Sequence, residues 1–490
     1  MSGLRAQYEK FPYPPIPIFA LPKRGQGREL SYEAGTRLAF GSPRTHTGIR
    51  ILVAGAGTLE PLVVAQAHPA AREIVAVDFS ARSLARLRFR SRMARVTRFI
   101  SSWPPIRTVQ EDLHEFGHQF GSKQDFGSYD YVLASNVLHH VADPALLLKH
   151  LSRFLKPGGI MRVVTYPYSS RLWMRETSRW LKLNGITPEI PDLLGRARET
   201  VESLPPDHPV RSCFESQPET KSRAGLVDAF LNALENPLTP LRWKAASEMA
   251  GLELVGEGQD EASRSSFLDE IALKARPLHP WIKLQVLDDL LELCANPVLW
   301  MKKTGEPPVG TEVDFKEPPV RSFEGENADF VRGMSPGQFI EGKTYLLPSR
   351  PRYEMKTALL RADAWLGTVG LQLDEVVSKL RTEVGPRVSV DDKHSLPGLA
   401  ISDYHLDEIM SVPEPWGTRE WEALGSEMPE LSMELDPGDY GISRVSGEPS
   451  LTPGGTLREQ AEWIQVRSGP GRSMIPVHFR KVMQKVSSKS

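Results

Sequence analysis

Two glycines follow the first strongly apolar run of the chain. The stretch ILVAGAGTLEP, residues 51–61, places Gly55 and Gly57 directly after a segment that has the composition of a buried strand. A glycine-rich turn between a strand and a helix presents backbone N–H groups and the positive end of the helix, which together suit an anionic group. A phosphate-binding loop would have a third glycine or a cation where Leu59 and Glu60 stand. The turn therefore predicts a ligand site and leaves the identity of the anion open.

Two acidic residues follow at spacings that fit a nucleoside. Asp78 ends the run EIVAVD, 21 residues after Gly57, and an acid at the tip of a second strand accepts hydrogen bonds from ribose hydroxyls. Asp112 follows a short strand-like run, where its carboxylate could accept the exocyclic amine of adenine or serve only as a solvated turn acid. The glycines and Asp78 together indicate an adenosine-containing cofactor.

The elements that must hold these residues form an alternating pattern. Between about 48 and 166, short apolar runs alternate with helix-compatible segments, which is typical of a doubly wound parallel sheet. In YDYVLASNVLHHVADPALLLKHLSRFLKPGG, a buried strand is expected to end at Ser135 and Asn136 and a helix to begin at Asp143 and Pro144. We expect Lys156 and the pair Gly158-Gly159 to close that helix.

The adjacent histidines of this stretch allow two interpretations. His139 or His140 could be a general base near the ligand, but two neighbouring side chains on a helix do not face one site. The favoured interpretation is that both are structural.

With these motifs in order, residues 45–166 resemble the class I S-adenosylmethionine-dependent methyltransferases, in particular the small-molecule-type branch that carries "NVLHH" and "LKPGG". The resemblance implies a Rossmann-like α/β fold and S-adenosyl-L-methionine as cofactor. It assigns the methionine end to Gly55 and Gly57, the ribose to Asp78, the adenine to Asp112, and a place beside the methionine to Asn136. The implied cofactor-binding set, with neighbours included, is Gly55, Ala56, Gly57, Asp78, Phe79, Asp112, Leu113 and Asn136. The anion is then a carboxylate accompanied by an amine, with no metal and no assigned catalytic residue.

This chain departs from the family pattern at two positions. Val53 stands where many relatives have an acid before the loop, and Leu59 replaces the third glycine. The first departure weakens the expected contact to the cofactor amine, and the second could narrow the pocket. Glu60 could replace the missing acid or be a simple first-turn acid that suits the helix dipole.

Segments outside this core resemble methyltransferases less specifically. The N-terminal YEKFPYPPIPIF could act as a lid, with Tyr8 or Tyr13 placed over a sulfonium by cation–π attraction, or could be a proline-rich surface arm. Three polar residues could line the acceptor site, namely Asp207, His208 and Asp228. Isolated polar residues of this kind more often cap helices or form turns.

Composition excludes several partners. The 60 basic and 61 acidic residues give a formal charge of −1, so the chain has no global attraction to nucleic acid or anionic membrane. Seven arginines lie between Arg82 and Arg98. They form either a patch that binds nucleic acid or another polyanion, or a solvated helix face. The second interpretation is favoured, with the acidic stretch at 427–439 docked against this face. The spacing of the two cysteines, Cys213 and Cys294, suggests neither a metal site nor a disulfide framework, which indicates a reducing compartment. The sequence also has no apolar run long enough to span a membrane. Both observations predict a cytoplasmic protein.

The length predicts several domains. We expect an N-terminal arm or lid at 1–45, a cofactor-binding Rossmann-like domain at 46–166, and a mainly helical extension with the last strands of the catalytic domain at 167–302. A linker at 303–339 and a C-terminal region of unassigned function at 340–490 follow. Within these, 251–257 and 266–275 are candidate strands, 281–303 reads as one or two helices, and a helix is expected near 355–367.

The sequence therefore predicts a methyltransferase that acts on an unidentified oxygen, nitrogen or carbon nucleophile. One alternative is a nicotinamide-dependent oxidoreductase, because a strand, GxG and a downstream Asp also fit a dinucleotide, although Leu59-Glu60 opposes a pyrophosphate. The other is a non-catalytic S-adenosylmethionine-binding scaffold. No oligomeric state is predicted.

Overall fold

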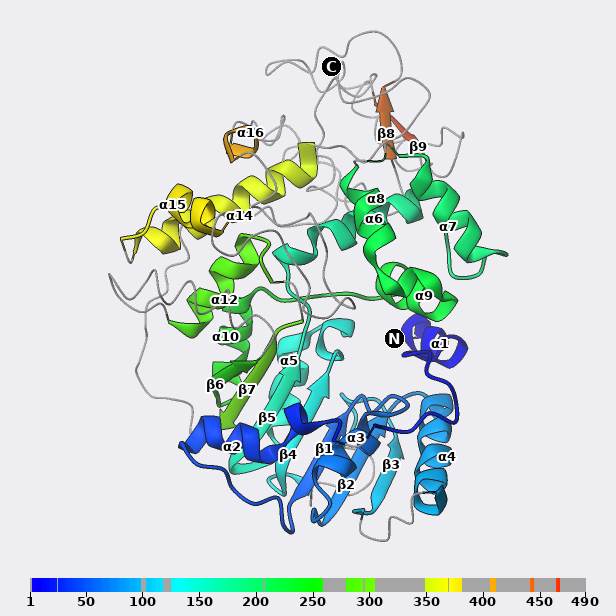
Figure 1. Ribbon diagram of the computed structural model, residues 1–490, viewed down its shortest axis with the longest axis vertical. Coiled ribbons are helices and arrows are strands. Elements are labelled where there is room, and N and C mark those ends of the chain that lie inside the picture. The colour runs from blue at the N-terminus through cyan, green and yellow to red at the C-terminus, as the bar shows by residue number, and fades with distance from the viewer. Residues whose placement is uncertain are drawn as a thin grey trace, which may run out of the picture.

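One seven-stranded sheet organises the protein in this computed structural model (Figure 1). The structure describes residues 2–23, 25–97, 103–117, 125–204, 206, 208–258, 279–293, 296–304, 349–368, 370–380, 406–410, 441–444 and 464–467. The strand order is β3-β2-β1-β4-β5-β7-β6. The strands are β1 (Arg50–Ala54), β2 (Glu73–Asp78), β3 (Ile106–Gln110), β4 (Tyr129–Ser135), β5 (Leu155–Val164), β6 (Leu252–Gly258) and β7 (Val298–Lys303).

Five strands run parallel and two complete one edge. Strands β3, β2, β1, β4 and β5 pair in parallel, while β7 pairs antiparallel with both β5 and β6. The predicted α/β fold of the class I methyltransferase type is confirmed. Its sheet is mixed where the sequence predicted a parallel one.

The sheet has a buried face on each side. Along β1, Ile51 and Val53 belong to one apolar cluster, whereas Leu52 and Ala54 belong to the other. Side chains alternate between faces in a strand, so a run that is apolar at every position must be covered by helices on both sides. Three helices supply side chains to the first cluster, namely α2 (Tyr32–Phe40), α3 (Glu60–Ala67) and α4 (Ala81–Thr97). The other cluster takes side chains from α5 (Pro144–Ser152), α10 (Pro240–Met249) and α12 (Pro280–Asp289).

The strand order reverses between β1 and β4. The chain proceeds from β1 to β2 and β3 on one side and places β4 and β5 on the other. In open α/β sheets a ligand crevice lies beyond the carboxyl ends of the strands at such a switch point. The loops after β1, β2, β3 and β4, which carry the predicted cofactor residues, all lie at that edge.

Further helices lie above this edge in Figure 1. These are α6 (Leu172–Leu183), α7 (Leu193–Glu202), α8 (Pro209–Ser216) and α9 (Arg223–Phe230), preceded or joined by the short 3-10 helices η3 (Leu138–His140), η4 (Ser169–Arg171) and η5 (Pro218–Lys221). The helical content predicted for 167–250 is confirmed. The N-terminal part gives α1 (Ser2–Lys10) and η1 (Arg28–Leu30). C-terminal elements are α14 (Ser349–Gly367), α15 (Leu373–Lys379), α16 (Leu406–Met410) and the antiparallel pair β8 (Gly441–Arg444) and β9 (Ile464–Arg467).

Two local expectations were wrong. Helix α5 begins as predicted, with the Asp143 side chain accepting from the Leu146 N–H at 2.8 Å, but it ends at Ser152. Lys156, Gly158 and Gly159 lie within β5. The register against β4 jumps from Tyr129–Leu155 to Tyr131–Ile160, so the glycines form an irregularity in the strand pairing and do not cap the helix.

The second error concerns 281–303. Only its first part is helical, as α12, and the apolar run that follows forms β7. A short apolar run does not distinguish a buried strand from a helix, and here the free edge of β5 decides. The strand predicted at 251–257 is confirmed as β6, and the helix predicted near 355–367 is confirmed within α14. The candidate strand at 266–275, most of the linker at 303–339, Cys294 and the acidic stretch 427–439 lie outside the described residues.

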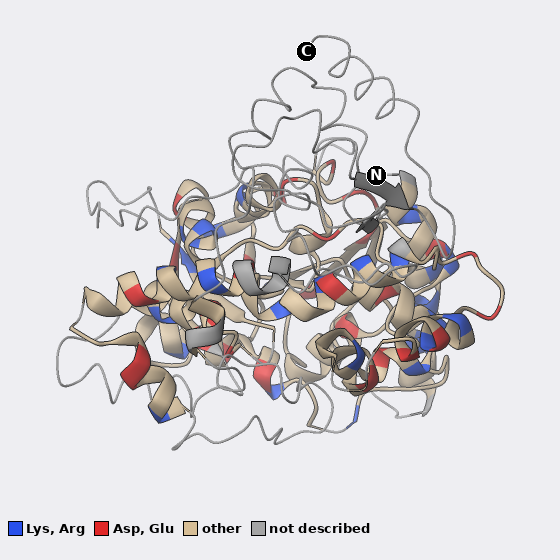
Figure 2. Ribbon diagram, turned by 90° about the horizontal axis from the view of Figure 1, so that it is seen from above, with Lys and Arg blue, Asp and Glu red and all other residues tan. Residues whose placement is uncertain are grey.

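The arginine-rich helix is α4, and its residues divide into two groups. Arg88, Arg92 and Arg95 are exposed, as a solvated face predicts, but Arg90 is fully buried. The Arg90 guanidinium donates to the carbonyls of Thr58, Ile16 and Pro17 at 2.7–3.0 Å, so it ties the N-terminal arm to the glycine loop. Seen from above, basic and acidic residues are interspersed over the helices (Figure 2). None of the described helices has the length and apolar character needed to cross a membrane.

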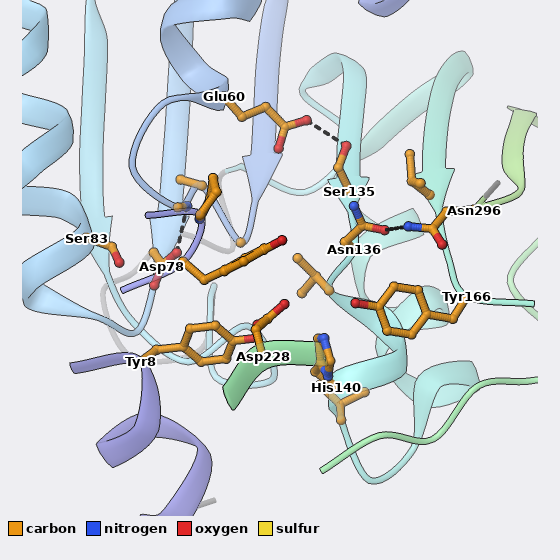
Figure 3. Close-up of a pocket in the computed structure, with 18 of the residues that line it drawn as sticks. Tyr8, Glu60, Asp78, Ser83, Ser135, Asn136, His140, Tyr166, Asp228 and Asn296 are labelled. Carbon is orange, nitrogen blue, oxygen red and sulfur yellow. Dashed lines mark hydrogen bonds between the residues drawn. The ribbon is translucent and has the colours of Figure 1, made fainter. Parts of the chain in front are cut away.

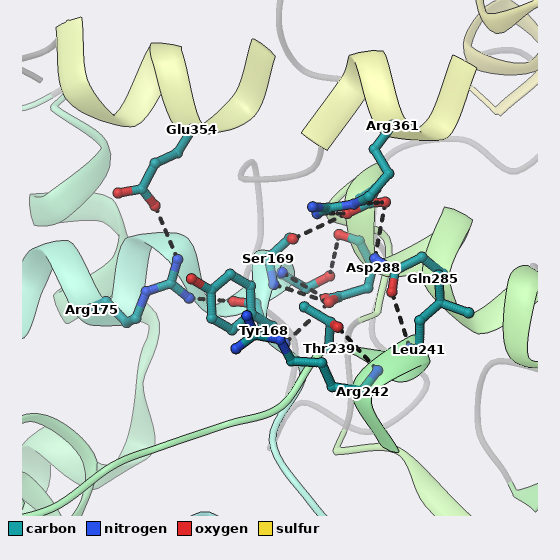
Figure 4. A network of polar contacts seen from close by, with 12 residues as sticks. Tyr168, Ser169, Arg175, Thr239, Leu241, Arg242, Gln285, Asp288, Glu354 and Arg361 are labelled. Atoms are coloured by element: carbon teal, nitrogen blue, oxygen red, sulfur yellow. Dashed lines mark hydrogen bonds and ion pairs between the residues drawn. The ribbon is translucent and has the colours of Figure 1, made fainter. Parts of the chain in front are cut away.

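A buried polar network joins α14 to α12 and to the segment that follows β5 (Figure 4). Arg361 forms an ion pair with Asp289, whose side chain is fully buried. The neighbouring Asp288 accepts from the backbone N–H groups of Tyr168, Ser169 and Ser170 at 2.9–3.1 Å. Apolar residues of α14 such as Leu359 also belong to the cluster under α5 and α12. Helix α14 therefore supports the segment that leaves β5 toward the pocket.

We expect Arg361→Ala to lower the free energy of unfolding by about 3–5 kcal/mol, because it leaves the Asp289 carboxylate buried without its cation. Urea denaturation measures this loss. Lys379→Ala is the control, since its exposed i,i+4 pair with Glu375 contributes only about 0.3–0.5 kcal/mol. Equal, small losses in both variants would show that α14 does not stabilise the sheet through this pair.

Candidate functional site

A large cavity lies at the carboxyl edge of the parallel strands. Its volume is about 1260 Å³, and its wall includes every residue of the predicted cofactor set. Figure 3 shows Asp78 and Asn136 of this set in the wall. These are Gly55, Ala56, Gly57, Asp78, Phe79, Asp112, Leu113 and Asn136. Ligand pockets commonly measure about 300–1,000 Å³, so this one has room for more than one small molecule.

The two loop glycines are required for different reasons. Both have positive φ, 70° at Gly55 and 55° at Gly57, a conformation that glycine adopts without strain. A Cβ on Gly55 would lie 2.2 Å from Val137 Cγ2, whereas a Cβ on Gly57 would meet nothing within 4 Å. Gly55 thus permits the loops after β1 and β4 to touch, and Gly57 leaves open space at the wall of the cavity.

The loop does not offer its first N–H groups to a ligand. Those of Gly55 and Ala56 donate to the Val77 carbonyl at 2.9 Å, and that of Gly57 donates to Asp78 Oδ2 at 2.8 Å. The turn was expected to present backbone N–H groups to an anion, but the neighbouring strand end accepts these three. An anion at this loop would take its hydrogen-bond donors from other groups.

Asp78 is held in place by the backbone. Besides Gly57, the N–H of Ser80 donates to its other oxygen at 2.8 Å, and the side chain is 9% exposed. Burial raises the pKa of the Asp78 carboxyl, while the two backbone hydrogen bonds lower it. A carboxylate offers about four acceptor positions, so two stay available for hydroxyl groups.

The remaining predicted residues surround the same space. Asp112 accepts from the His114 N–H at 2.9 Å, which fixes the turn after β3, and Leu113 is buried beneath it. Asn136 takes a positive φ of 54°, and its Oδ1 accepts from Asn296 Nδ2 at 3.0 Å, just ahead of β7. The binding roles that the resemblance gave to these residues stay predictions.

Glu60 points into the cavity and contacts the end of β4. Its Oε1 accepts from the Ser135 hydroxyl at 2.6 Å, and the Arg162 guanidinium donates to the same hydroxyl oxygen at 3.4 Å. Burial raises the pKa of the Glu60 carboxyl, and Ser135 and Arg162 oppose that shift. Leu59 packs against the apolar cluster and also borders the cavity, while Val53 is buried in the sheet. This geometry favours the interpretation that Glu60 replaces the acid that many relatives have at the position of Val53.

Sequence reasoning missed Arg162. It is 5% exposed, its Nε has no hydrogen-bond partner in the described part of the chain, and it lies in the wall of the cavity. The available signal was a single arginine inside the otherwise apolar run IMRVVTY. A buried guanidinium with a free donor suits a carboxylate.

The N-terminal helix closes the opposite side of the cavity. The Tyr8 hydroxyl donates to Asp228 Oδ1 at 2.8 Å, and its ring makes edge contacts with Phe79 and His140 at centroid distances of 5.9 and 6.4 Å. Glu9 accepts from the Ala81 and Arg82 N–H groups at the start of α4. Helix α1 therefore bridges α4 and α9, and Tyr8 forms part of the pocket.

Polar residues from the helices above the sheet edge complete this side of the cavity. Arg171 donates two hydrogen bonds of 3.3 Å to Glu235, and its guanidinium stacks 3.5 Å from the centre of the Tyr166 ring. The Tyr13 hydroxyl donates to Glu219 at 3.5 Å. Of the three acceptor candidates, Asp228 lines the cavity, His208 caps α8 by accepting from the Val210 N–H, and Asp207 lies outside the described residues.

Both histidines of the NVLHH segment are held by the protein. His139 is fully buried, accepts from the Tyr166 N–H through Nδ1 at 3.2 Å, and stacks on the Tyr166 ring. His140 Nδ1 contacts the Leu234 carbonyl at 2.8 Å while its ring borders the cavity. Burial lowers the pKa of both imidazoles. Their partners support the structural interpretation.

Comparison with known proteins identifies the central part of the chain. Residues 52–161 match the family model described as a methyltransferase domain. A curated protein of Synechococcus sp., described as uncharacterized, is 27% identical over 263 residues, which span 52% of this chain. The match covers 59% of that protein's length, less than two thirds of it.

Solved structures show more distant likeness. The structure of PKMT2 from Rickettsia typhi in complex with AdoHcy is 12% identical, with a TM-score of 0.41, and the match covers 74% of this chain and 75% of that one. An S-adenosylmethionine dependent methyltransferase from Mesorhizobium loti is 16% identical, with a TM-score of 0.28, over 56% of this chain and all of that one.

The predicted resemblance is therefore confirmed for the central domain. Residues 52–161 match a methyltransferase domain, and such a domain implies S-adenosylmethionine as the cofactor. The cavity fits this molecule by its own chemistry. It combines the open side of Gly57, the carboxylates of Asp78 and Glu60, and the unpartnered Arg162 Nε.

The two glycines supply a matched test. We expect Gly55→Ala to destabilise the protein by well over the roughly 1–2 kcal/mol that positive φ costs an alanine, because its methyl group also meets Val137. Gly57→Ala should cost only that conformational amount and should weaken S-adenosylhomocysteine binding, because its methyl group projects into the open space. Thermal denaturation and calorimetric titration of both variants measure this. Equal destabilisation by the two exchanges would contradict the distinction.

Proposed function

We propose that this protein transfers the methyl group of S-adenosylmethionine to a nucleophile that binds in the same cavity. One observation supports this most strongly: the cavity joins the cofactor side, around Asp78 and Glu60, to a second polar side around Tyr8, Tyr166 and Asp228 (Figure 3). Two ligands held in one enclosed space can meet in line. A scaffold that only binds the cofactor would not need the second side.

Each residue on the cofactor side would bind one polar or charged group of S-adenosylmethionine. Asp78 would accept from the ribose hydroxyls and Asp112 from the adenine amine. Glu60 would take the α-ammonium group and Arg162 the α-carboxylate, because these two side chains both contact the Ser135 hydroxyl. This arrangement uses the zwitterionic end of the cofactor to pair a half-buried carboxylate and a buried guanidinium.

Catalysis in this proposal depends on placement. The cofactor supplies an activated methyl group and a neutral thioether leaving group. The protein must hold the nucleophile in line and exclude water, and such orientation can contribute on the order of 7–11 kcal/mol. Helix α1 serves both needs, because it covers the cavity and presents Tyr8 to its interior.

The glycine loop at residues 55–57 argues against the alternative of a nicotinamide-dependent oxidoreductase. A dinucleotide pyrophosphate requires N–H groups that the loop can donate, yet those of Gly55, Ala56 and Gly57 are already used. The Glu60 carboxylate would also repel it. The non-catalytic scaffold is an outcome of the test below.

We expect the purified protein to bind S-adenosylhomocysteine and S-adenosylmethionine, and Asp78→Asn to weaken both by on the order of ten-fold or more, because a charged acceptor is lost. Glu60→Gln should act in the same direction. Glu73→Gln is the control, since Glu73 begins the same strand at the far edge and pairs with Arg50. Isothermal titration calorimetry gives the affinities.

Transfer of label from S-adenosyl[methyl-³H]methionine to cell-extract fractions tests the activity itself. Tight binding that depends on Asp78, with no labelled product in any fraction, would support the scaffold. An affinity that neither exchange changes would remove the proposed cofactor site.

A further inference from the structure

We propose that the methyl acceptor is an amine, which enters as an ammonium group, binds between the Asp228 carboxylate and the Tyr8 ring, and gives its proton to Asp228. This inference rests on the proposed methyl transfer and names its substrate class and proton acceptor. It is carried by a buried, incompletely paired carboxylate that faces a cavity with aromatic walls.

Asp228 has the geometry of a ligand-binding carboxylate. It lies on α9, is 5% exposed, and borders the cavity. Its Oδ1 accepts from the Tyr8 hydroxyl at 2.8 Å, while Oδ2 has no hydrogen-bond partner within the described ranges. Figure 3 shows the carboxylate directed into the same space as the Tyr8 and Tyr166 side chains. Because Asp228 borders the cavity, this oxygen is available to a donor that a ligand brings.

The charges around Asp228 favour a cationic ligand. Arg171 is the cation whose charge acts on the Asp228 carboxyl, and its guanidinium already pairs with Glu235 through two hydrogen bonds. Glu219 adds a second acid. Its Oε2 is buried without a partner among the residues that the structure describes, and its Oε1 lies 3.5 Å from the Tyr13 hydroxyl. This end of the cavity therefore has more carboxylate than its own cation neutralises. An anionic acceptor would be repelled here, and a neutral hydroxyl would leave the excess uncompensated.

Aromatic rings supply the second feature of an ammonium site. Tyr8, Tyr13 and Tyr166 all border the cavity. A cation within about 6 Å of such a ring is attracted to the electron-rich face, more strongly where water is excluded. Carboxylates and aromatic rings together can hold an ammonium group, and the rest of the ligand need carry no charge.

The step balances with the groups present. The nitrogen lone pair forms the new C–N bond while the C–S bond breaks and its electron pair stays on sulfur. For the lone pair to be available, one proton must leave the ammonium group, and the free Oδ2 of Asp228 accepts it. Burial raises the pKa of Asp228 to about 7, so the carboxyl can both bind a cation and take up a proton near neutral pH.

The ionisation of Asp228 depends on the groups that face it from each neighbouring element. The Tyr8 hydrogen bond and the Arg171 charge lower the pKa of Asp228, whereas Glu235 and Glu219 raise it. Tyr13 and Tyr166 also interact with its charge. Cation binding requires the ionised carboxylate, so the affinity for an ammonium ion should fall as the pH drops below about 7.

The test uses the full chain saturated with S-adenosylhomocysteine, titrated calorimetrically with benzylammonium and with benzyl alcohol, its neutral counterpart of similar size. We expect saturable binding of the ammonium probe, weaker binding of the alcohol, and an ammonium affinity lower by on the order of ten-fold or more in Asp228→Asn. Glu215→Gln is the matched control, because this exposed acid on α8 pairs with Arg211 outside the cavity. Tyr8→Phe should move the pH midpoint of ammonium binding upward, since it removes the hydrogen bond that lowers the pKa of Asp228.

Three results would each overturn the inference: no saturable ammonium binding, equal or tighter binding of the alcohol, or unchanged ammonium affinity in Asp228→Asn. The S-adenosylhomocysteine affinity measured in the same samples separates this failure from that of the proposed function. If that ligand binds the wild type and the Asp228→Asn variant alike, the cofactor site stands whatever the probes do.

Discussion

The close approach of Gly55 to Val137 is the constraint on which the rest of the site depends. These residues follow β1 and β4, the two strands between which the sheet order reverses, and a side chain on Gly55 would lie 2.2 Å from Val137. Because the loops touch there, the Gly57 N–H reaches Asp78, and Ser135 meets Glu60 across the gap. One missing side chain thus brings the ends of β1, β2 and β4 into a single pocket wall.

The cavity is built from two sides with different chemistry. On the sheet side, the carboxylates of Asp78 and Glu60 are fixed by hydrogen bonds from backbone and hydroxyl groups, with the Arg162 guanidinium beside them. On the helical side, Asp228 accepts a hydrogen bond from the Tyr8 hydroxyl, and no residue of the described ranges donates to its other oxygen. Both sides thus retain polar groups that a bound molecule can pair with, a guanidinium and carboxylates near the sheet and a carboxylate beside the helices.

Two peripheral helices hold these sides together. Helix α1 links α4 to α9 through Glu9 and Tyr8, so the cavity closes only when the N-terminal arm is in place. Behind the pocket, Arg361 of α14 neutralises Asp289, and Asp288 binds the backbone of residues 168–170, which precede Arg171. Segments about 350 residues apart in sequence therefore act on one site.

The sequence alone determined the parallel strands and the loops at their carboxyl ends, and it predicted Gly55, Gly57, Asp78 and Asn136 at one cavity, because these follow from local apolar runs, glycines and acids at fixed spacing. It did not determine that 298–303 is a strand, that Gly158 and Gly159 lie within β5, or that Arg90 is buried, because each depends on an edge or a segment far away in the chain. The same reason applies to the helical side of the pocket. Tyr8 and Asp228 are 220 residues apart, and only the packing of α1 against α9 made them partners.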